Sequence, residues 1–328
     1  MMASDEREHE PMRIGAVDVG SNGIRMVVAE VDDQGQLHEI ESSREPVRLG
    51  ADAFQKGRIS PAAINKTVKA FVRFAKIFQA HQVTKVRAVA TSAVRDAANG
   101  RQIIDRILDV TGLRLQVISG LTEAQLVFEA VAGSVNLQGK TAMLVDMGGG
   151  SVEITISRNG QAMGSETLPL GCVRLMQELR KRRWSESRTE QLIARYRGTI
   201  SGLVRAELDD EHPQVVVGTG GNIETLARLR TVLLPKIKTG KVKLSDLDLM
   251  VPKLLDMSVQ QRIRRLGLRP DRADVITIAA IVLRMVMQDA GIYRLLAPGV
   301  GLKDGLLRQL VDDMVNNAVP SRNTKRKK

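Results

Sequence analysis

Aromatic residues are scarce in this chain of 328 residues, which has one Trp, two Tyr and five Phe. Proteins that recognise nucleic acid by base stacking need exposed rings, and so few rings must also fill a core. A specific nucleic-acid partner is therefore not expected. Lys and Arg number 49 against 37 Asp and Glu, a formal charge of +12. Positive charge without rings indicates a polyanion that is rich in phosphate and poor in bases.

The chain also has few cysteine and histidine residues and no long apolar run. Cys172 is the single cysteine, so an internal disulfide and a Cys-rich metal cluster are excluded. The four His residues are scattered without ligand spacing, which argues against a zinc site. No run approaches the roughly 18 apolar residues of a membrane-spanning helix, and the acidic N-terminus does not resemble a signal peptide. We expect a cytoplasmic protein with no membrane partner.

The composition, 43% hydrophobic and 26% charged, is that of a folded globular protein, and the length predicts two domains. Residues 1–12 are polar and predict a disordered lead-in. Pro320–Lys328 carries five positive charges and no hydrophobic residue, so residues 317–328 are expected to form a basic disordered tail.

The first 130 residues alternate between strand and helix patterns, which predicts an α/β fold. Strands are expected at 14–17, 24–31, 37–42, 86–90 and 115–118, and helices from Pro61, over 97–110 and from Thr122. Ser60 before Pro61, and Thr122 with Gln125, have the spacing of helix caps. The second half predicts strands at 142–145 and 152–156, and then mainly helix, including a buried one over Ala273–Gln288.

Two glycine turns with an Asp in front of them repeat at an offset of 128 residues. Each follows an apolar strand and precedes another: Val17-Asp18-Val19-Gly20-Ser21-Asn22, and Val145-Asp146-Met147-Gly148-Gly149-Gly150 followed by Ser151. An offset of this length is typical of a duplicated domain. A third glycine turn, Gly218-Thr219-Gly220-Gly221, runs into a predicted helix over 223–232.

Such turns present backbone N–H groups to an anion. Because an Asp repels phosphate, each Asp makes sense if a divalent cation lies between carboxylate and phosphate. Two facing turns would then form a phosphate clamp with a metal between the lobes. Asp-x-Gly is also ordinary turn chemistry, but its paired occurrence after two apolar strands favours the clamp.

Further charged and hydroxyl residues are candidates. Glu123, in the first turn of a predicted helix, either complements the helix dipole or orients an attacking water. Glu153 lies two residues after Ser151 on the same strand face and could reach the metal or the water. Arg95 could bind phosphate oxygens, and Thr91 could do so through its hydroxyl or cap the helix.

Motifs in this order resemble those of the exopolyphosphatase / guanosine pentaphosphate phosphatase family. They cover about residues 13–315: Asp18-x-Gly-Ser-Asn22, Ala90-Thr-Ser-Ala-x-Arg-x-Ala-x-Asn99, Ile118-Ser-Gly-x-x-Glu-Ala124, Asp146-x-Gly-Gly-Gly-Ser-x-Glu153, Leu168-Pro-Leu-Gly-x-Val-Arg174, Gly218-Thr-Gly-Gly221, Arg272-Ala-Asp274 and Gly301-Leu-Lys-Asp-Gly305. Gly23 and Thr122 depart from the family pattern, and the chain is a short form without the C-terminal helical region of longer members.

The resemblance implies the fold of the actin–hexokinase–acetate kinase superfamily. Two ribonuclease-H-like (actin-like) lobes, each a mixed five-stranded sheet with helices, would flank a central cleft. Residues 13–127 plus 303–316 would form the first lobe and 128–302 the second. A homodimer is also a possibility that the apolar helical part leaves open.

The resemblance further implies hydrolysis of a terminal phosphoanhydride with Mg²⁺ or another divalent cation such as Mn²⁺. Glu123 and Glu153 would be the catalytic acids, and Asp18 and Asp146 the metal ligands. Phosphate would be bound by Gly20, Ser21, Asn22, Thr91, Arg95, Gly148, Gly149, Gly150, Ser151, Gly220 and Gly221. These parts suit phosphoryl transfer, which depends mainly on positioning and charge neutralisation.

Four functions are weighed. An exopolyphosphatase acting on inorganic polyphosphate is favoured, because the chain is basic and poor in aromatic residues. A guanosine pentaphosphate (pppGpp) phosphatase would use the same clamp with a guanine pocket. A superfamily sugar or acetate kinase is disfavoured by the Glu123 motif and the short length. A polyanion-binding protein without turnover is disfavoured by the intact set of acids.

Overall fold

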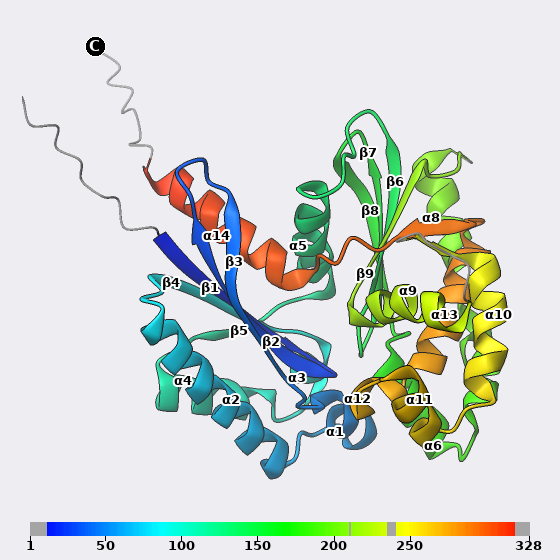
Figure 1. Ribbon diagram of the computed structural model, residues 1–328, viewed down its shortest axis with the longest axis horizontal. Coiled ribbons are helices and arrows are strands. Elements are labelled where there is room, and N and C mark those ends of the chain that lie inside the picture. The colour runs from blue at the N-terminus through cyan, green and yellow to red at the C-terminus, as the bar shows by residue number, and fades with distance from the viewer. Residues whose placement is uncertain (1–11, 210, 235–240, 319–328) are drawn as a thin grey trace, which may run out of the picture.

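The protein has two mixed sheets side by side, each flanked by helices, in a computed structural model that describes residues 12–209, 211–234 and 241–318 (Figure 1). The predicted lead-in lies outside the described residues except Met12, which begins the first strand. The predicted tail lies outside them except residues 317 and 318, at the end of the last helix. Within the described residues, no helix combines the length and apolarity needed to cross a bilayer.

The first sheet has the strand order β3-β2-β1-β4-β5. β1 pairs antiparallel with β2 and parallel with β4. Helices α1 to α4 lie on one side of the sheet, and α5 and α14 on the other (Figure 1). The bounds are β1 Met12–Gly20, β2 Gly23–Val31, β3 Leu37–Glu45, β4 Lys85–Ala90, β5 Leu115–Val117, α1 Leu49–Lys56, α2 Pro61–Ala80, α3 Ser92–Asp96, α4 Gly100–Thr111, α5 Gly120–Ala132 and α14 Leu302–Ala318.

The second sheet has the order β10-β11-β9-β6-β7-β8, with β6 antiparallel to β7 and parallel to β9. Its strands are β6 Thr141–Met147, β7 Val152–Arg158, β8 Gln161–Leu168, β9 Val215–Thr219, β10 Lys241–Lys243 and β11 Arg294–Leu296. Its helices are α6 Cys172–Lys181, η1 Glu186–Arg188, α7 Thr189–Ile193, η2 Ala194–Tyr196, α8 Thr199–Leu208, α9 Gly221–Leu233, α10 Leu244–Leu255, α11 Val259–Leu266, α12 Pro270–Ala273 and α13 Ile276–Asp289.

The two sheets share one topology, since β8-β7-β6-β9-β11 repeats the arrangement β3-β2-β1-β4-β5. The predicted duplication and the actin-like α/β class are therefore confirmed. The expectation of five strands in each lobe is wrong for the second sheet, which gains a sixth, β10, at its edge. Sequence patterning also missed β8, because its exposed residues break the apolar alternation, and the three-residue β11, because it is too short for a period.

Strand alternation directs the acidic residues toward the middle of the molecule. Ile14 and Ala16 of β1, and Ala142 and Leu144 of β6, belong to one apolar cluster with α5 and α14. Because side chains on a strand alternate in direction, Asp18 and Asp146 continue that same face at the ends of their strands. The alternation in each lobe thus places one carboxylate on the side of its sheet that packs against α5.

Two predicted helix starts need correction. The helix predicted over 97–110 is α4, which begins at Gly100; extended backbone at Ala97 separates it from the short helix α3. The helix predicted from Thr122 begins at Gly120 and is capped by Ser119, whose side chain accepts a hydrogen bond from the Thr122 N–H. The Ser60 cap of α2 and the buried helix α13 are confirmed.

Helix α14 returns the chain to the first lobe. It contacts β1, β2, β4 and α5, and α5 approaches so closely that a Cβ on Gly305 would lie 2.0 Å from the Leu126 carbonyl oxygen. The division of the chain expected from the sequence, 13–127 plus 303–316 against 128–302, stays a prediction.

Candidate active site

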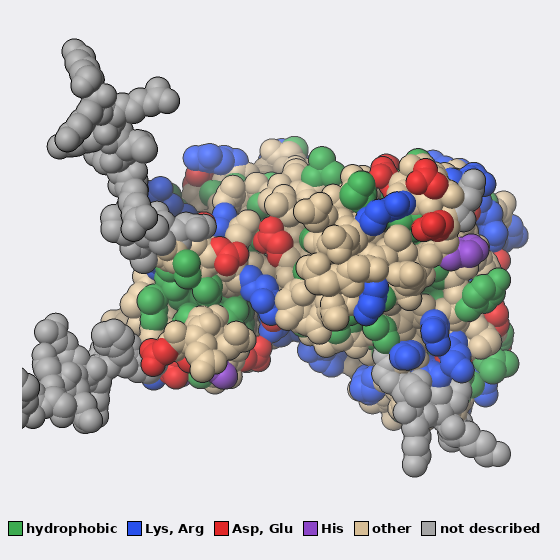
Figure 2. All heavy atoms as spheres, turned by 90° about the horizontal axis from the view of Figure 1, so that it is seen from above, with side chains coloured by type: hydrophobic (Ala, Val, Ile, Leu, Met, Phe, Trp, Pro, Cys, Tyr) green, Lys and Arg blue, Asp and Glu red, His purple; other side chains and the backbone are tan. Residues whose placement is uncertain are grey.

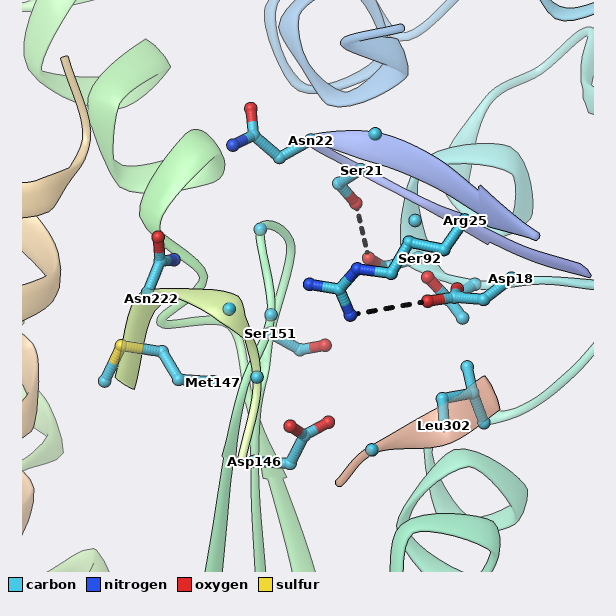
Figure 3. Close-up of a pocket in the computed structure, with 18 of the residues that line it drawn as sticks. Asp18, Ser21, Asn22, Arg25, Ser92, Asp146, Met147, Ser151, Asn222 and Leu302 are labelled. Carbon is cyan, nitrogen blue, oxygen red and sulfur yellow. Dashed lines mark hydrogen bonds and ion pairs between the residues drawn. The ribbon is translucent and has the colours of Figure 1, made fainter. Parts of the chain in front are cut away.

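A cavity of about 80 Å³ lies between the two sheets, where the predicted glycine turns meet (Figure 3). The β1–β2 turn, the β6–β7 turn, the β9–α9 turn and the start of α5 form its walls. Of the predicted site residues, it is lined by Asp18, Gly20, Ser21, Asn22, Thr91, Glu123, Asp146, Gly148, Gly149, Ser151, Gly220 and Gly221.

The β1–β2 and β6–β7 turns face each other directly. A Cβ added to Gly149 would lie 3.0 Å from the Cβ of Ser21 and 3.4 Å from the backbone N of Asn22. A Cβ on Gly150 would lie 2.0 Å from the Ser92 hydroxyl, which is itself 2.9 Å from the Ser21 hydroxyl. Glycine is therefore required here for close approach of the two lobes.

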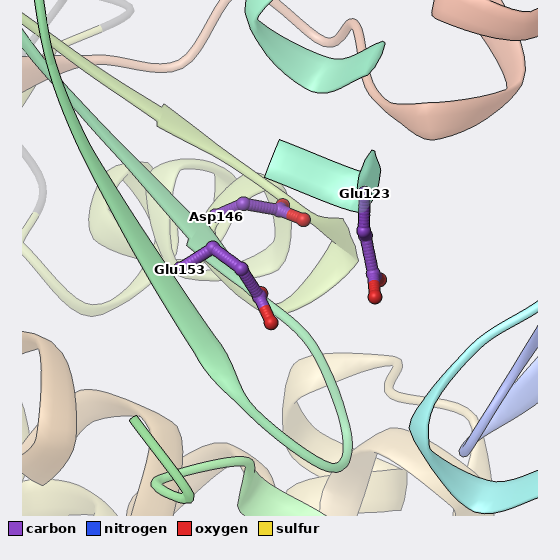
Figure 4. A group of neighbouring side chains, drawn as sticks. All are labelled: Glu123, Asp146 and Glu153. Atoms are coloured by element: carbon purple, nitrogen blue, oxygen red, sulfur yellow. The ribbon is translucent and has the colours of Figure 1, made fainter. Parts of the chain in front are cut away.

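Three carboxylates converge at this cavity: Glu123 from the first turn of α5, Asp146 from the end of β6, and Glu153 from β7 (Figure 4). Each side chain contributes one carboxylate oxygen, and these three oxygens all lie within 4.8 Å of one another. Glu123 and Glu153 are buried, with 8% and 2% of their surfaces exposed. The group joins both predicted catalytic acids with one predicted metal ligand, and Asp18 lies outside it.

Burial and mutual repulsion raise the pKa values of these acids. The pKa of Glu123 is raised well above its ordinary value, first by burial and then by Glu153 and Asp146. Burial, with the Asp146 charge, raises the pKa of Glu153 to about 8, although Ser151 and Arg95 oppose the shift. Burial also raises the pKa of Asp146, against a 2.7 Å hydrogen bond from the Thr219 hydroxyl. The three side chains can be ionised together only if an additional positive charge lies beside them.

The cluster fits a divalent cation on its own geometry. Oε2 of Glu123 and both carboxylate oxygens of Glu153 are buried and accept no hydrogen bond. Buried polar atoms without partners are costly, and hard cations such as Mg²⁺ take carboxylate oxygens as ligands. The donor set and its unpaired oxygens thus suit the metal that the sequence implies.

Three arginines also line the cavity: Arg25, Arg44 and Arg272. Sequence reasoning gave none of them a role, although Arg272 stands in one of the family motifs. Arg25 stands opposite Asp18 in the β1–β2 register, with Nη1 3.9 Å from Oδ2 (Figure 3). Burial lowers the pKa of Arg272 to about 10, and the charges of Arg25 and Arg44 add to this. Arg25 could have been found from its position, because it is a charged residue inside an apolar strand, directly after the first turn.

Asn22 faces the cleft but its side chain joins the lobes. Its Nδ2 donates to the Asp271 carbonyl oxygen at 2.8 Å, and its Oδ1 accepts from Arg48 Nε at 2.9 Å. The Asn22 carbonyl accepts from Arg44 Nη2, also at 2.9 Å. With these side-chain partners engaged, Asn22 has its backbone N–H, rather than its side chain, to offer an anion.

Three predicted residues do not line the cavity. Gly150 lies behind the turn, where its carbonyl accepts from Arg174 Nε at 2.7 Å. Arg95 donates to the Ile118 carbonyl at 3.0 Å and pairs with Asp96, so it acts on the acids by charge alone. Glu153 lies beneath the cavity floor, within reach of the other two acids.

The comparisons with known proteins agree with this geometry. The model of the Ppx/GppA phosphatase family matches residues 27–314. Among curated proteins, Exopolyphosphatase 2 of Mycobacterium tuberculosis is 32% identical over 91% of this chain and 98% of its own, and Exopolyphosphatase 1 of Mycobacterium leprae is 28% identical over 92% and 90%.

Solved structures give the same result. An Aquifex aeolicus member of the Ppx/GppA family is 25% identical, with a TM-score of 0.74 over 94% of this chain and 99% of that one. An exopolyphosphatase from Cytophaga hutchinsonii, at 24% identity, shares the fold with a TM-score of 0.81 over 92% and 98%. This chain therefore belongs to the Ppx/GppA phosphatase family and is a phosphoanhydride hydrolase.

Proposed function

We propose that this enzyme is an exopolyphosphatase that hydrolyses the terminal phosphoanhydride of inorganic polyphosphate and releases orthophosphate. The observation that carries the proposal is the union in one cleft of a buried carboxylate cluster, two facing glycine turns and three arginines. The curated relatives carry the name exopolyphosphatase, which supports the same substrate.

The cleft favours a substrate without a base. Among the described residues that line it, none is aromatic, so a guanine would find no ring to stack on. An adjoining hollow of about 230 Å³ shares Arg25, Arg44 and Arg272 with the cleft and adds Arg269 and Lys303. Successive cations suit a substrate that carries a negative charge at every unit.

The glycine turns would hold the terminal phosphate. Backbone N–H groups of the β1–β2 and β6–β7 turns would be the donors, at a point where the turns approach too closely for a side chain at Gly149. Gly220 and Gly221 place the N-terminus of α9 at the same cleft, and its partial positive charge favours an anion. Ser21, Ser151 and Thr91 add hydroxyl donors.

The cation would be held by Asp146 and Glu153, with Asp18 on the facing strand end, and Mg²⁺ or Mn²⁺ suits these oxygen ligands. When bound, it would supply the positive charge that lets the cluster ionise and that neutralises the phosphate oxygens. The Thr219 hydroxyl fixes the orientation of Asp146 from β9.

Glu123 would act on the attacking water. Burial and the neighbouring acids raise its pKa well above the ordinary carboxyl value, which makes its carboxylate a stronger base toward a water proton. The water oxygen bonds to the terminal phosphorus, the bond to the bridging oxygen breaks, and Glu123 takes the water proton. Orthophosphate and a chain shorter by one unit result.

The test is phosphate release at fixed ionic strength from long polyphosphate, tripolyphosphate and guanosine pentaphosphate. We expect the highest kcat/KM on polyphosphate. A higher kcat/KM on guanosine pentaphosphate, which has the same type of terminal bond, would assign the enzyme to that substrate instead. Absence of phosphate release from all three would contradict the proposal. The homodimer and the cytoplasmic location expected from the sequence stay predictions.

A further inference from the structure

Two basic segments that lie far apart in the sequence come together on the second lobe. One segment, Arg180–Arg183, covers the C-terminal end of α6 and the two residues after it. The other consists of Arg264 and Arg265 in the last turn of α11. The link is Glu186 of η1, just beyond α6, whose carboxylate accepts from Arg262 of α11 at 2.5 and 3.0 Å. Helix α6 contacts η1, so η1 connects the ends of α6 and α11, which are labelled at the lower right of Figure 1.

This surface keeps its positive charge. Arg180, Arg183, Arg264 and Arg265 are exposed, and none of their side chains makes an ion pair or hydrogen bond to another described residue. The nearby acids are already engaged: Glu178 pairs with Lys181 and Arg182, and Glu186 pairs with Arg262. In contrast, the face seen in Figure 2, away from α6 and α11, mixes both signs of charge.

The helix dipole does not account for the arrangement. A basic last turn stabilises the C-terminus of a single helix. Two such ends placed together repel each other, which costs stability unless an anion binds between them. We call Arg180, Arg183, Arg264 and Arg265 the α6/α11 basic surface.

The surface favours a polyanion without bases. Trp184 is its one ring, and it is half-buried with Arg182 and Arg188 stacked at 5.2 and 5.9 Å from its centroid. The ring is thus occupied by guanidinium groups rather than free for a nucleobase. Arginines held around a ring match phosphate oxygens instead.

The basic surface connects to the cleft along two elements. Arg269, four residues after Arg265, lines the hollow that adjoins the cleft. Helix α6 starts directly under the phosphate turn, where the Val173 N–H donates to the Gly149 carbonyl, and its ten residues span about 15 Å to the basic end. Arg269 therefore provides a cation between the cleft and the α11 part of the surface.

We propose that the α6/α11 basic surface is a second binding site for polyphosphate, which holds the part of a long chain that extends beyond the cleft. This inference rests on the proposed function. It predicts that charge outside the active site makes the enzyme bind long chains more tightly than short ones, and that short phosphates use the cleft alone.

The test compares a triple variant, Arg183→Ala with Arg264→Ala and Arg265→Ala, with a control that removes the same charge from α2: Lys66→Ala, Lys69→Ala and Lys76→Ala, all exposed. Initial rates are measured on long polyphosphate and on tripolyphosphate at several salt concentrations. Binding of long polyphosphate is measured separately in a Glu123→Gln background, so that it does not depend on turnover.

We expect KM for long polyphosphate to rise about tenfold in the triple variant, and the slope of log KM against log salt to fall by about 2, since three phosphate contacts are lost. KM for tripolyphosphate should change by less than about twofold, and the α2 control should resemble the wild type on both substrates. The dissociation constant for long polyphosphate should rise in the triple variant by about the same factor as KM.

Equal effects on both substrates, or no change in binding of long polyphosphate, would overturn the inference while leaving the proposed function intact. If single-stranded nucleic acid displaces bound long polyphosphate as effectively as unlabelled polyphosphate does, the surface would instead be assigned to nucleic acid. If the wild-type protein binds polyphosphate at this surface but does not cleave it, the proposed function is contradicted and the binding site is supported.

Discussion

Arg25 and Glu153 occupy the same position in the two lobes and carry opposite charges. Arg25 stands opposite Asp18 in the β1–β2 pair, as Glu153 stands opposite Asp146 in the β6–β7 pair, and both pairs of equivalent residues are 128 residues apart. The first lobe therefore neutralises its Asp internally, whereas the second sets two carboxylates side by side. The duplicated fold thus has a cation beside the Asp in one lobe and a second acid beside it in the other.

Replacing Glu123 should separate binding from turnover. Glu123→Gln keeps the size of the side chain and removes the base, so phosphate release should fall by roughly 100-fold or more. Polyphosphate binding should persist, because the turns and arginines are untouched. The matched control is Glu129→Gln, further along α5 and outside the cleft, which should keep near-normal turnover. Near-normal turnover in Glu123→Gln would remove its assignment as the base.

Replacing Asp146 should weaken the use of the divalent cation. In Asp146→Asn, activity should require a higher Mg²⁺ concentration, by about tenfold or more, because one carboxylate ligand is lost. Titration of Mg²⁺ against initial rate measures this shift. Asp105→Asn, at an exposed position on α4, serves as the charge-matched control. Wild-type activity that survives chelation of divalent ions would contradict the cation site.

Stability without divalent ions should fall as pH rises. The pKa of Glu153 is raised from its ordinary value of 4.5 to about 8, so the folded state holds more protons than the unfolded state between those values. Unfolding free energy is then lost as pH increases through that window. Thermal melts in chelator from pH 5 to 8 should show a falling Tm, and Glu153→Gln should flatten the fall. A Tm that rises with pH would contradict the raised pKa of Glu153.

The close approach of the β6–β7 turn to α1 and α3 should depend on glycine at position 150. Gly150→Ala places a methyl group 2.0 Å from the Ser92 hydroxyl and 2.8 Å from the Phe54 ring, so we expect a loss of about 1–3 kcal/mol of stability and of most activity. Denaturant unfolding and phosphate release measure both. Gly202→Ala is the control, because nothing lies within 4 Å of its added Cβ in α8, and it should be neutral or stabilising. Equal behaviour of the two variants would contradict the close approach.

Arg48 and Asp274 should be coupled energetically. Arg48 Nη1 lies 2.6 Å from Asp274 Oδ2, and the same guanidinium holds Asn22, so the pair joins the lobes behind the first turn. A double-mutant cycle with Arg48→Ala and Asp274→Asn should give a coupling of about 1 kcal/mol or more in unfolding free energy.

The exposed pair Arg101 and Asp105 provides the comparison for that cycle. It is an i, i+4 pair on α4, with 82% and 47% of the side chains exposed, and should give about 0.3–0.5 kcal/mol. A coupling for Arg48 and Asp274 no larger than this surface value would mean that the ion pair does not hold the lobes together.

Local sequence patterns were sufficient for much of the fold. Strand and helix periods predicted the α/β class, and the repeated Asp-Gly turns predicted the duplication that β1–β2 and β6–β7 display. The errors occurred where the pattern is short or exposed, as in β8 and β11, or where a cap precedes the apolar run, as at Ser119. Short elements gain their stability from neighbouring strands, which a local pattern does not contain.

The sequence by itself determined the chemistry that each segment carries: turns with free N–H groups, strands that end in a carboxylate, and an excess of cations over rings. The tertiary structure decided which of these meet. It placed Glu123 against Asp146 and Glu153, turned the Asn22 side chain to the lobe interface, and brought Arg25, Arg44 and Arg272 into the cleft. Desolvation and charge interaction depend on distance in space, so pKa shifts and partners arise only once the chain has folded.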